Sequence, residues 1–89
     1  MAITADTIVA PAPGVEPRRY LKGMVIDPGI SLNEVASFIF SQFDGERSLK
    51  QVAEAVTREY QISLDDCLPD VIGTASELVE FNVVKIVSP

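Results

Sequence analysis

The side chains that could carry out chemistry in this chain are few, and they gather around Cys67. Asp65 and Asp66 precede Cys67 and Asp70 follows it, whereas the sequence contains no histidine. Cysteine and serine nucleophiles commonly depend on a histidine that accepts their proton, so such a pair is excluded within this chain. Acidic neighbours on an apolar helix raise the pKa of a thiol. We therefore expect Cys67 to be an unreactive structural residue.

The residue patterns that hold metals or phosphates are also missing. One cysteine and no histidine cannot supply the ligands of a typical structural zinc site. Asp65 and Asp66 lack the spacing of a calcium loop, and stabilisation of a helix N-terminus explains them better. The glycines do not form a phosphate-binding loop. We expect no metal, no cofactor and no catalytic activity, so the chain is not expected to be an enzyme.

The size and composition are those of one small folded domain. The chain has 89 residues, of which 47% are hydrophobic, and its net charge is −6. An acidic chain is a poor partner for nucleic acid, because binding depends on neutralising phosphates. Its apolar runs are shorter than the about 20 residues of a membrane span, and its N-terminus does not resemble a signal peptide. With only one cysteine, these features favour a cytoplasmic protein without membrane association.

The first third of the chain predicts a small antiparallel sheet. Residues 1–14 are expected to be a tail, part of which could add an edge strand, and the domain is placed at residues 15–89. Within it, residues 15–21, 24–26 and 30–32 are the expected strands. Pro17 lacks an N–H, so it confines the first strand to an edge or shortens it. Asp27, Pro28 and Gly29 form a turn between the other two strands.

Two helices are expected next, each with a recognisable start. Asn33 can cap the first helix with its side chain, and Gly45 is expected to end that helix in a left-handed conformation. Ser48 starts the second helix, and Gln51, three residues on, completes a capping box. The buried stripe of the second helix is expected at Leu49, Val52, Ala53 and Val56, with Tyr60 as a further member.

The third helix is expected to open at Ser63 or Asp66 and to end near Asn82, followed by a strand or core filler at residues 83–87. Pro69 predicts an irregular first turn or a later start. The helix carries more apolar surface than one packing face needs. A second, semi-polar line beside its main stripe is either buried in a small core or forms the wall of a groove; it consists of Cys67, Val71, Thr74 and Leu78.

The order and spacing of these features resemble the PqqD-like peptide-recognition domain, also called the RiPP recognition element. The resemblance extends from about residue 15 to residue 87 and predicts an α+β, winged-helix-like fold, with a small three-stranded antiparallel sheet followed by three helices. It rests on Leu32-Asn33 entering a helix, Ala36, Ile39, Asp44-Gly45, Ser48, Val52-Ala53 and an apolar third helix.

The resemblance implies a non-catalytic adaptor in the biosynthesis of ribosomally made, modified peptides, such as lasso peptides. Such a domain binds the leader of a precursor peptide as an added strand and presents it to a separate leader peptidase or radical enzyme. An exposed strand edge could also pair with a second copy of the chain. The peptide-binding residues expected from the resemblance are Ile30, Ser31, Leu32, Cys67, Asp70, Val71, Thr74, Ala75 and Leu78.

Two other functions have weaker support in the sequence. The second and third helices have the spacing of a helix-turn-helix, but the third helix is acidic, whereas a DNA-reading helix needs basic and amide side chains. A small acidic helical chain could also be a carrier protein. Ser63 follows Ile62, however, and not the aspartate of a phosphopantetheine attachment site, and the expected strands do not fit that fold.

Overall fold

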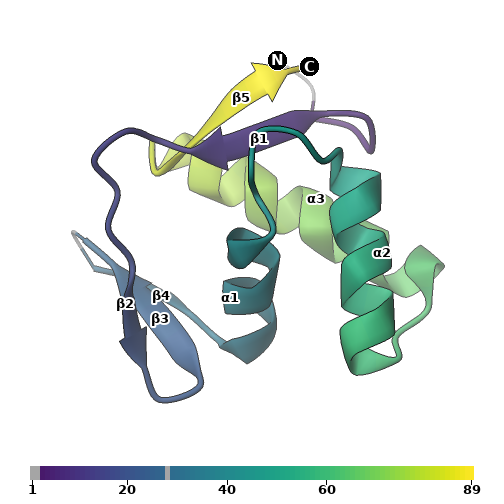
Figure 1. Ribbon diagram of the computed structural model, residues 1–89, viewed down its shortest axis with the longest axis horizontal. Coiled ribbons are helices and arrows are strands. Elements are labelled where there is room, and N and C mark those ends of the chain that lie inside the picture. The colour runs from purple at the N-terminus through teal and green to yellow at the C-terminus, as the bar shows by residue number, and fades with distance from the viewer. Residues whose placement is uncertain (1–2, 28) are drawn as a thin grey trace.

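The computed structural model describes residues 3–27 and 29–89, which form two small sheets and three helices (Figure 1). Figure 1 shows one sheet at the top, the other at the lower left, and the helices between them. In chain order, the elements are β1 (Ile8–Pro11), β2 (Arg18–Tyr20), β3 (Gly23–Ile26), β4 (Ile30–Leu32), α1 (Glu34–Ser41), α2 (Leu49–Tyr60), α3 (Leu64–Glu80) and β5 (Val84–Ser88).

Strands β2, β3 and β4 form the predicted antiparallel sheet, and their spatial order is β2-β3-β4. Gly23 is required where β3 meets the end of β4, because a Cβ atom there would lie 2.0 Å from the Leu32 carbonyl oxygen. At the other end of this hairpin, the Gly29 amide donates to the Ile26 carbonyl at 3.0 Å. Pro28 of the predicted turn lies outside the described residues. The sheet thus places β4 at one edge and β2 at the other.

Helix α1 starts as predicted, with the Asn33 side chain accepting from the Ala36 amide at 2.8 Å. The prediction that Gly45 ends this helix is wrong. The helix ends at Ser41 and is capped by Gln42 in a right-handed conformation. Gly45 does have the expected positive φ of +79°, but it lies in the following loop, where its amide donates to the Val9 carbonyl at 3.1 Å.

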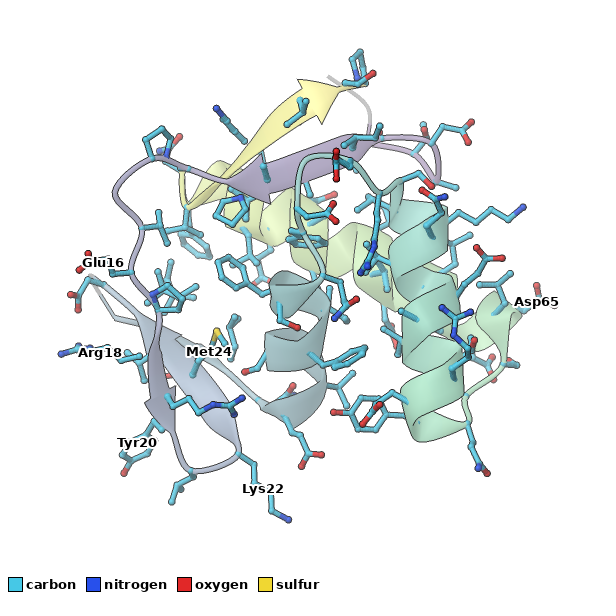
Figure 2. The ribbon with its side chains drawn as sticks, in the orientation of Figure 1. Glu16, Arg18, Tyr20, Lys22, Met24 and Asp65 are labelled. Atoms are coloured by element: carbon cyan, nitrogen blue, oxygen red, sulfur yellow. The ribbon has the colours of Figure 1, made fainter. Side chains whose placement is uncertain are left out.

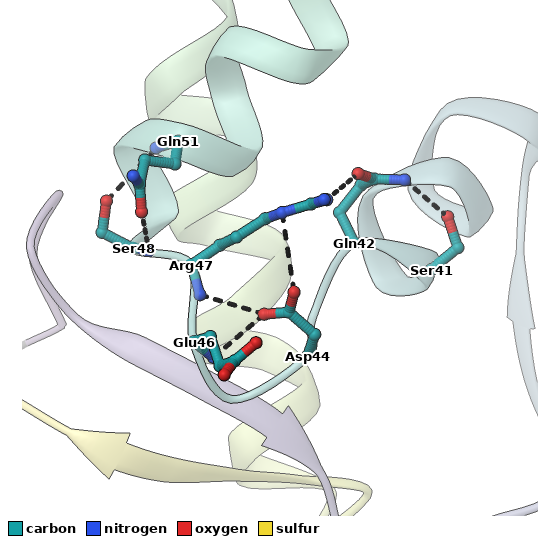
Figure 3. Close-up of polar contacts among 7 residues, drawn as sticks. All are labelled: Ser41, Gln42, Asp44, Glu46, Arg47, Ser48 and Gln51. Carbon is teal, nitrogen blue, oxygen red and sulfur yellow. Dashed lines mark hydrogen bonds and ion pairs between the residues drawn. The ribbon is translucent and has the colours of Figure 1, made fainter.

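The loop between α1 and α2 is held by the carboxylate of Asp44 (Figure 3). This carboxylate accepts hydrogen bonds from the backbone amides of Glu46 and Arg47, both at 2.9 Å, and lies 3.5 Å from the Arg47 guanidinium. These contacts, led by the Arg47 amide, lower the pKa of Asp44 below its usual value. The Asp-Gly sequence therefore forms an anchored loop and not a helix cap.

Helix α2 is amphipathic and starts with the predicted capping box. The Ser48 hydroxyl accepts from the Gln51 amide, and the Gln51 side chain accepts from the Ser48 amide. Its predicted stripe of Leu49, Val52, Ala53 and Val56 is buried, which confirms the 3.6-residue periodicity. This face packs against α3, and the two helices supply equal numbers of buried core residues.

Helix α3 begins at Leu64 behind the cap Ser63 and continues past Pro69, so the expected irregular first turn does not occur. Pro69 removes only the amide that would have bonded to the Asp65 carbonyl. Asp65 is exposed, so water can reach the region of that carbonyl. The proline is therefore tolerated near the start of the helix, and Asn82 follows the end of the helix with a left-handed φ of +62°.

Part of the segment expected to be a tail packs into the domain. Strand β1 pairs antiparallel with β5, and Val9 is only 1% exposed. The segment just before β1 is also joined to α2, because the Leu49 amide donates to the Thr7 carbonyl at 2.9 Å. The alternative of a final strand at the C-terminus is confirmed by β5. Burial of Val9 supplies the apolar contact that a loose tail would lack.

One core joins these elements except β2, whose three residues are exposed. Its buried members come from β1, β3, the three helices and β5, and include Ile26, Ile39, Phe40, Leu49 and Leu78. The predicted α+β fold, with a three-stranded antiparallel sheet and three helices, is confirmed. The β1–β5 pair is an additional sheet that covers the other side of the helices.

Candidate functional site

A groove runs between strand β4 and helix α3. It consists of three adjoining hollows of about 480, 270 and 530 Å³. We call it the β4–α3 groove. Its lining includes Ile30, Ser31, Leu32, Asn33, Ala36, Asp70, Gly73, Thr74, Glu77, Leu78 and Phe81.

Strand β4 supplies the backbone side of the groove. It pairs with β3 only, in a register that joins Ile26 to Ile30 and Met24 to Leu32. In an antiparallel strand some backbone amides and carbonyls point away from the paired neighbour. Among the described residues no strand pairs with that second edge. The groove therefore has hydrogen-bonding groups available to an extended segment.

Helix α3 supplies the opposite wall through one of its faces. Asp70, Gly73, Thr74, Glu77 and Phe81 are three or four residues apart, so they lie along the same side of the helix. Gly73 lacks a side chain, and a Cβ atom built there would meet nothing within 4 Å. The wall is consequently lowest at Gly73 and polar along its rim.

The floor of the groove is apolar. Ile30 and Leu32 of β4 are half-buried, as is Ala36 of α1. Leu78 of α3 reaches the groove with only 2% of its surface exposed, and Phe81 at its end is 53% exposed. An apolar floor with a polar rim suits a peptide that places some side chains in pockets and leaves others in water.

Negative charge dominates the α3 side of the groove. Asp70 and Glu77 line it, and α3 carries no lysine or arginine. Asp65 and Asp66 extend the acidic surface to the start of the helix. None of these side chains forms an ion pair within the described residues. The groove therefore has a potential that attracts cationic ligands.

Six of the nine predicted binding residues line this groove, and three do not. Cys67, Val71 and Ala75 are 3%, 0% and 0% exposed and belong to the core. Of the predicted second line on the third helix, only Thr74 and Leu78 reach the groove. The predicted residues that do line it are Ile30, Ser31, Leu32, Asp70, Thr74 and Leu78.

The sequence reasoning missed five of the groove residues named above, one of which is Asn33, expected there only as the cap of the first helix. Gly73, Glu77 and Phe81 continue the spacing of Asp70 and Thr74 along the helix, so helical periodicity extended from these two could have found them. Ala36 comes from a different element, α1, and no local pattern in the sequence indicates which of its faces borders β4.

Cys67 is buried against α2, where its Sγ lies 3.6 Å from the Ala53 carbonyl oxygen. Desolvation, and secondarily the charge of Asp70, raises the pKa of this thiol above its ordinary value of 9.0. The low reactivity expected of Cys67 is consistent with this environment. Within the described residues no group of three metal-binding side chains is present, and no described helix is long and apolar enough to span a membrane.

We predict that the Cys67 thiol of the native protein reacts with a disulfide reagent more than about 100-fold more slowly than that of the denatured protein, because access requires opening the core. Since the pKa is raised on folding, the contribution of Cys67 to stability is complete below the ordinary value of 9.0 and declines as the pH rises above it. Reaction rates and urea unfolding between pH 7 and pH 10 measure both effects. Equal rates in the native and denatured protein would contradict the burial.

Comparison with known proteins supports this description. A model of the family described as Coenzyme PQQ synthesis protein D (PqqD) matches residues 23–84, which include the three-stranded sheet's β3 and β4 and all three helices. A solved structure with the same fold is the solution NMR structure of the PqqD truncation of Methylobacterium extorquens PqqCD. That protein is described as a functional and stand-alone RiPP recognition element. The TM-score is 0.78 at 16% identity, covering 94% of this chain and 95% of the other. A search of the curated proteins gave no match.

Proposed function

Because this chain belongs to the PqqD family, we propose that it is a non-catalytic adaptor that binds the leader of a ribosomally synthesised precursor peptide. The leader lies in the β4–α3 groove as an added strand, and the adaptor presents it to a modifying enzyme or leader peptidase. The single observation that carries this proposal is that the outer edge of β4, with which no described strand pairs, faces a groove with an apolar floor.

In strand addition, backbone groups of the leader supply affinity and its side chains supply selectivity. Backbone amides and carbonyls of the leader pair with the free edge of β4, whatever the leader sequence. Alternate side chains of an extended peptide point to opposite sides, so one set meets the floor formed by Leu32, Ala36 and Leu78. The volume available beside Gly73 favours bulky apolar side chains at one position of the leader.

The charge of the groove selects for basic residues in the leader. Asp70 and Glu77 lie on its rim and are exposed, so an arginine or lysine of the peptide can pair with them without being fully desolvated. Such pairs contribute mainly to the rate of association and to discrimination. The same charge distribution disfavours DNA, since α3 offers no basic side chain to phosphates.

The reaction itself is assigned to a separate protein. The chain has no histidine, and its single cysteine is buried. The partner that fits is a leader peptidase or radical enzyme of the same biosynthetic pathway, acting in the cytoplasm on the peptide that the adaptor holds. Lasso-peptide biosynthesis is the pathway class that we favour.

A fluorescence-polarisation titration tests this function. The labelled probes are leader peptides encoded beside the gene of this chain and scrambled versions of the same composition. We expect saturable binding in the micromolar range or tighter for one leader, weakening with added salt because of the acidic groove. Equal binding of the scrambled peptide, or no binding of any leader to folded protein, would refute the proposal.

A further inference from the structure

The turn between β2 and β3 presents apolar side chains to solvent. Leu21 is 86% exposed and Tyr20 is 66% exposed, the two largest values among the exposed large hydrophobic side chains. Leu21 also has a φ of +57°, a conformation that bulky residues rarely adopt. Neither feature stabilises the isolated domain, since exposed apolar side chains gain no burial on folding and a positive φ is unfavourable for leucine. Exposed apolar side chains that cluster in this way are typical of an interaction site.

Positive charge is concentrated at the same place. The seven basic residues of the chain include Arg18, Arg19 and Lys22, all within five positions, although the net charge is −6. Arg18 pairs with Asp27 at 3.0 Å, whereas Arg19 and Lys22 form no ion pair with any described residue. Figure 2 shows Tyr20 and Lys22 pointing outwards from the sheet, at the opposite end of the molecule from Asp65.

A hollow of about 380 Å³ lies between this turn and helices α1 and α2. Arg19, Leu21 and Lys22 line one side of it, and Met24, which Figure 2 shows between the sheet and α1, lines another part. The far side is formed by Phe38 and Tyr60, whose rings meet edge to face at 5.6 Å. The hollow, which we call the socket, thus has apolar walls with two cations at its rim that pair with no described residue. Ser37, Ser41 and Glu34 add polar groups to the lining, and the Glu34 carboxylate already accepts a hydrogen bond from the Tyr60 hydroxyl at 3.4 Å.

This socket is separate from the β4–α3 groove. It borders β2, which is the opposite edge of the sheet from β4. The residues that line the socket and those that line the groove have no member in common. A leader in the groove and a second protein on the socket would not compete for the same side chains.

We propose that this surface, defined as Arg19–Lys22 with the socket formed by Met24, Phe38 and Tyr60, docks an acidic and apolar patch of the enzyme that receives the leader. The inference rests on the proposed function for the identity of that partner. Leu21 and Tyr20 supply the buried apolar contact, and an apolar side chain of the enzyme enters the socket. Arg19 and Lys22 pair with carboxylates around it.

A protein partner fits this surface better than lipid or nucleic acid. Two unpaired cations are few for a phosphate surface, and the acidic remainder of the chain would be repelled by it. A carboxylate patch on a folded protein needs only local complementarity, and aromatic and arginine side chains are enriched in such interfaces. Anionic vesicles therefore serve as the alternative occupant in the test.

The test uses three variants of the full chain. Arg19→Glu/Lys22→Glu reverses the charge of the surface, and Leu21→Asn removes the apolar tip with a residue that tolerates positive φ. Lys50→Glu/Arg58→Glu is the matched control, because it makes the same change in net charge at exposed positions of α2. Each variant is titrated against the purified peptidase or radical enzyme encoded beside the gene, against the leader peptide, and against phosphatidylglycerol vesicles.

We expect the first two variants to weaken enzyme binding by about tenfold or more, while the control variant and leader binding stay unchanged. The inference is overturned if these two variants bind the enzyme as tightly as the wild-type chain does, or if the control variant loses as much enzyme affinity as they do. It is also overturned if the wild-type chain does not bind the enzyme. Vesicle binding that only the first two variants lose would overturn it in favour of lipid. If the wild-type chain binds the enzyme through this surface but binds no leader, the docking surface stands and the proposed leader recognition fails.

Discussion

Replacing Val71 by glutamate is expected to unfold this domain, and any loss of peptide binding will follow from that. Val71 is fully buried in the face of α3 that packs on the core. An unpaired carboxylate at such a position costs about 3–5 kcal/mol, which is most or all of the about 5 kcal/mol that stabilises a marginal domain of this size. Sequence reasoning alone would treat Val71 as a groove residue and interpret the same variant as a binding defect.

Circular dichroism and urea unfolding separate the two interpretations. Thr74→Glu is the matched control, because it places the same charge three residues further along α3, at the rim of the groove, where the carboxylate reaches water. We expect a folded control and a largely unfolded Val71→Glu variant. A Val71→Glu variant with unchanged far-ultraviolet signal and unchanged urea midpoint would show that the packing of α3 described here is wrong.

The second large effect is expected at Gly73, where a side chain would enter the groove without disturbing the core. A Cβ atom at this position meets nothing within 4 Å, and the residue is exposed on α3. Gly73→Phe is therefore expected to weaken leader binding by about tenfold or more, since it occupies volume that the peptide needs. The substitution is not expected to lower the stability of the domain, because glycine is itself a poor helix residue.

Gly73→Ala is the matched control for the helix effect. It is expected to stabilise the domain by about 1 kcal/mol, because alanine is the better helix former, and to leave most of the groove open. Leader affinity is measured by fluorescence polarisation and stability by urea unfolding. If Gly73→Phe binds the leader as tightly as Gly73→Ala does, the peptide does not lie along this part of α3.

Local patterns in the sequence predict correctly where the helices begin. Asn33, Ser48 and Ser63 each cap a helix with a side-chain oxygen, and this signal depends only on residues three positions apart. The buried stripe of α2 follows in the same way from its periodicity. The family resemblance adds the winged-helix-like arrangement of the sheet and the helices, which local patterns do not contain.

The sequence-based predictions fail where a contact between segments far apart in the chain determines the local structure. Gly45 has the backbone of a helix cap, but the Asp44 carboxylate and the Val9 carbonyl hold it in a loop instead. Strand β1 forms because β5 is available to pair with it, at the far end of the chain. Both contacts join segments that local periodicity treats as independent.

The division of α3 into a core face and a groove face shows the same limit. Cys67, Val71 and Ala75 form one line along the helix, and Asp70, Thr74 and Glu77 form the neighbouring line. Amphipathic spacing identifies both lines but does not state which elements cover them. Only the positions of α2 and β4 decide that the first line is core and the second is the groove wall.

The central claim is that a leader peptide adds to β4 as a strand. The most direct measurement is an NMR titration of the isotope-labelled chain with the leader peptide, followed by intermolecular NOEs. We predict NOEs between the peptide backbone and Ile30, Ser31 and Leu32, with further contacts to Gly73 and Thr74 on α3. Saturable binding whose NOEs lie instead on α2 or on the β2–β3 turn would contradict the claim.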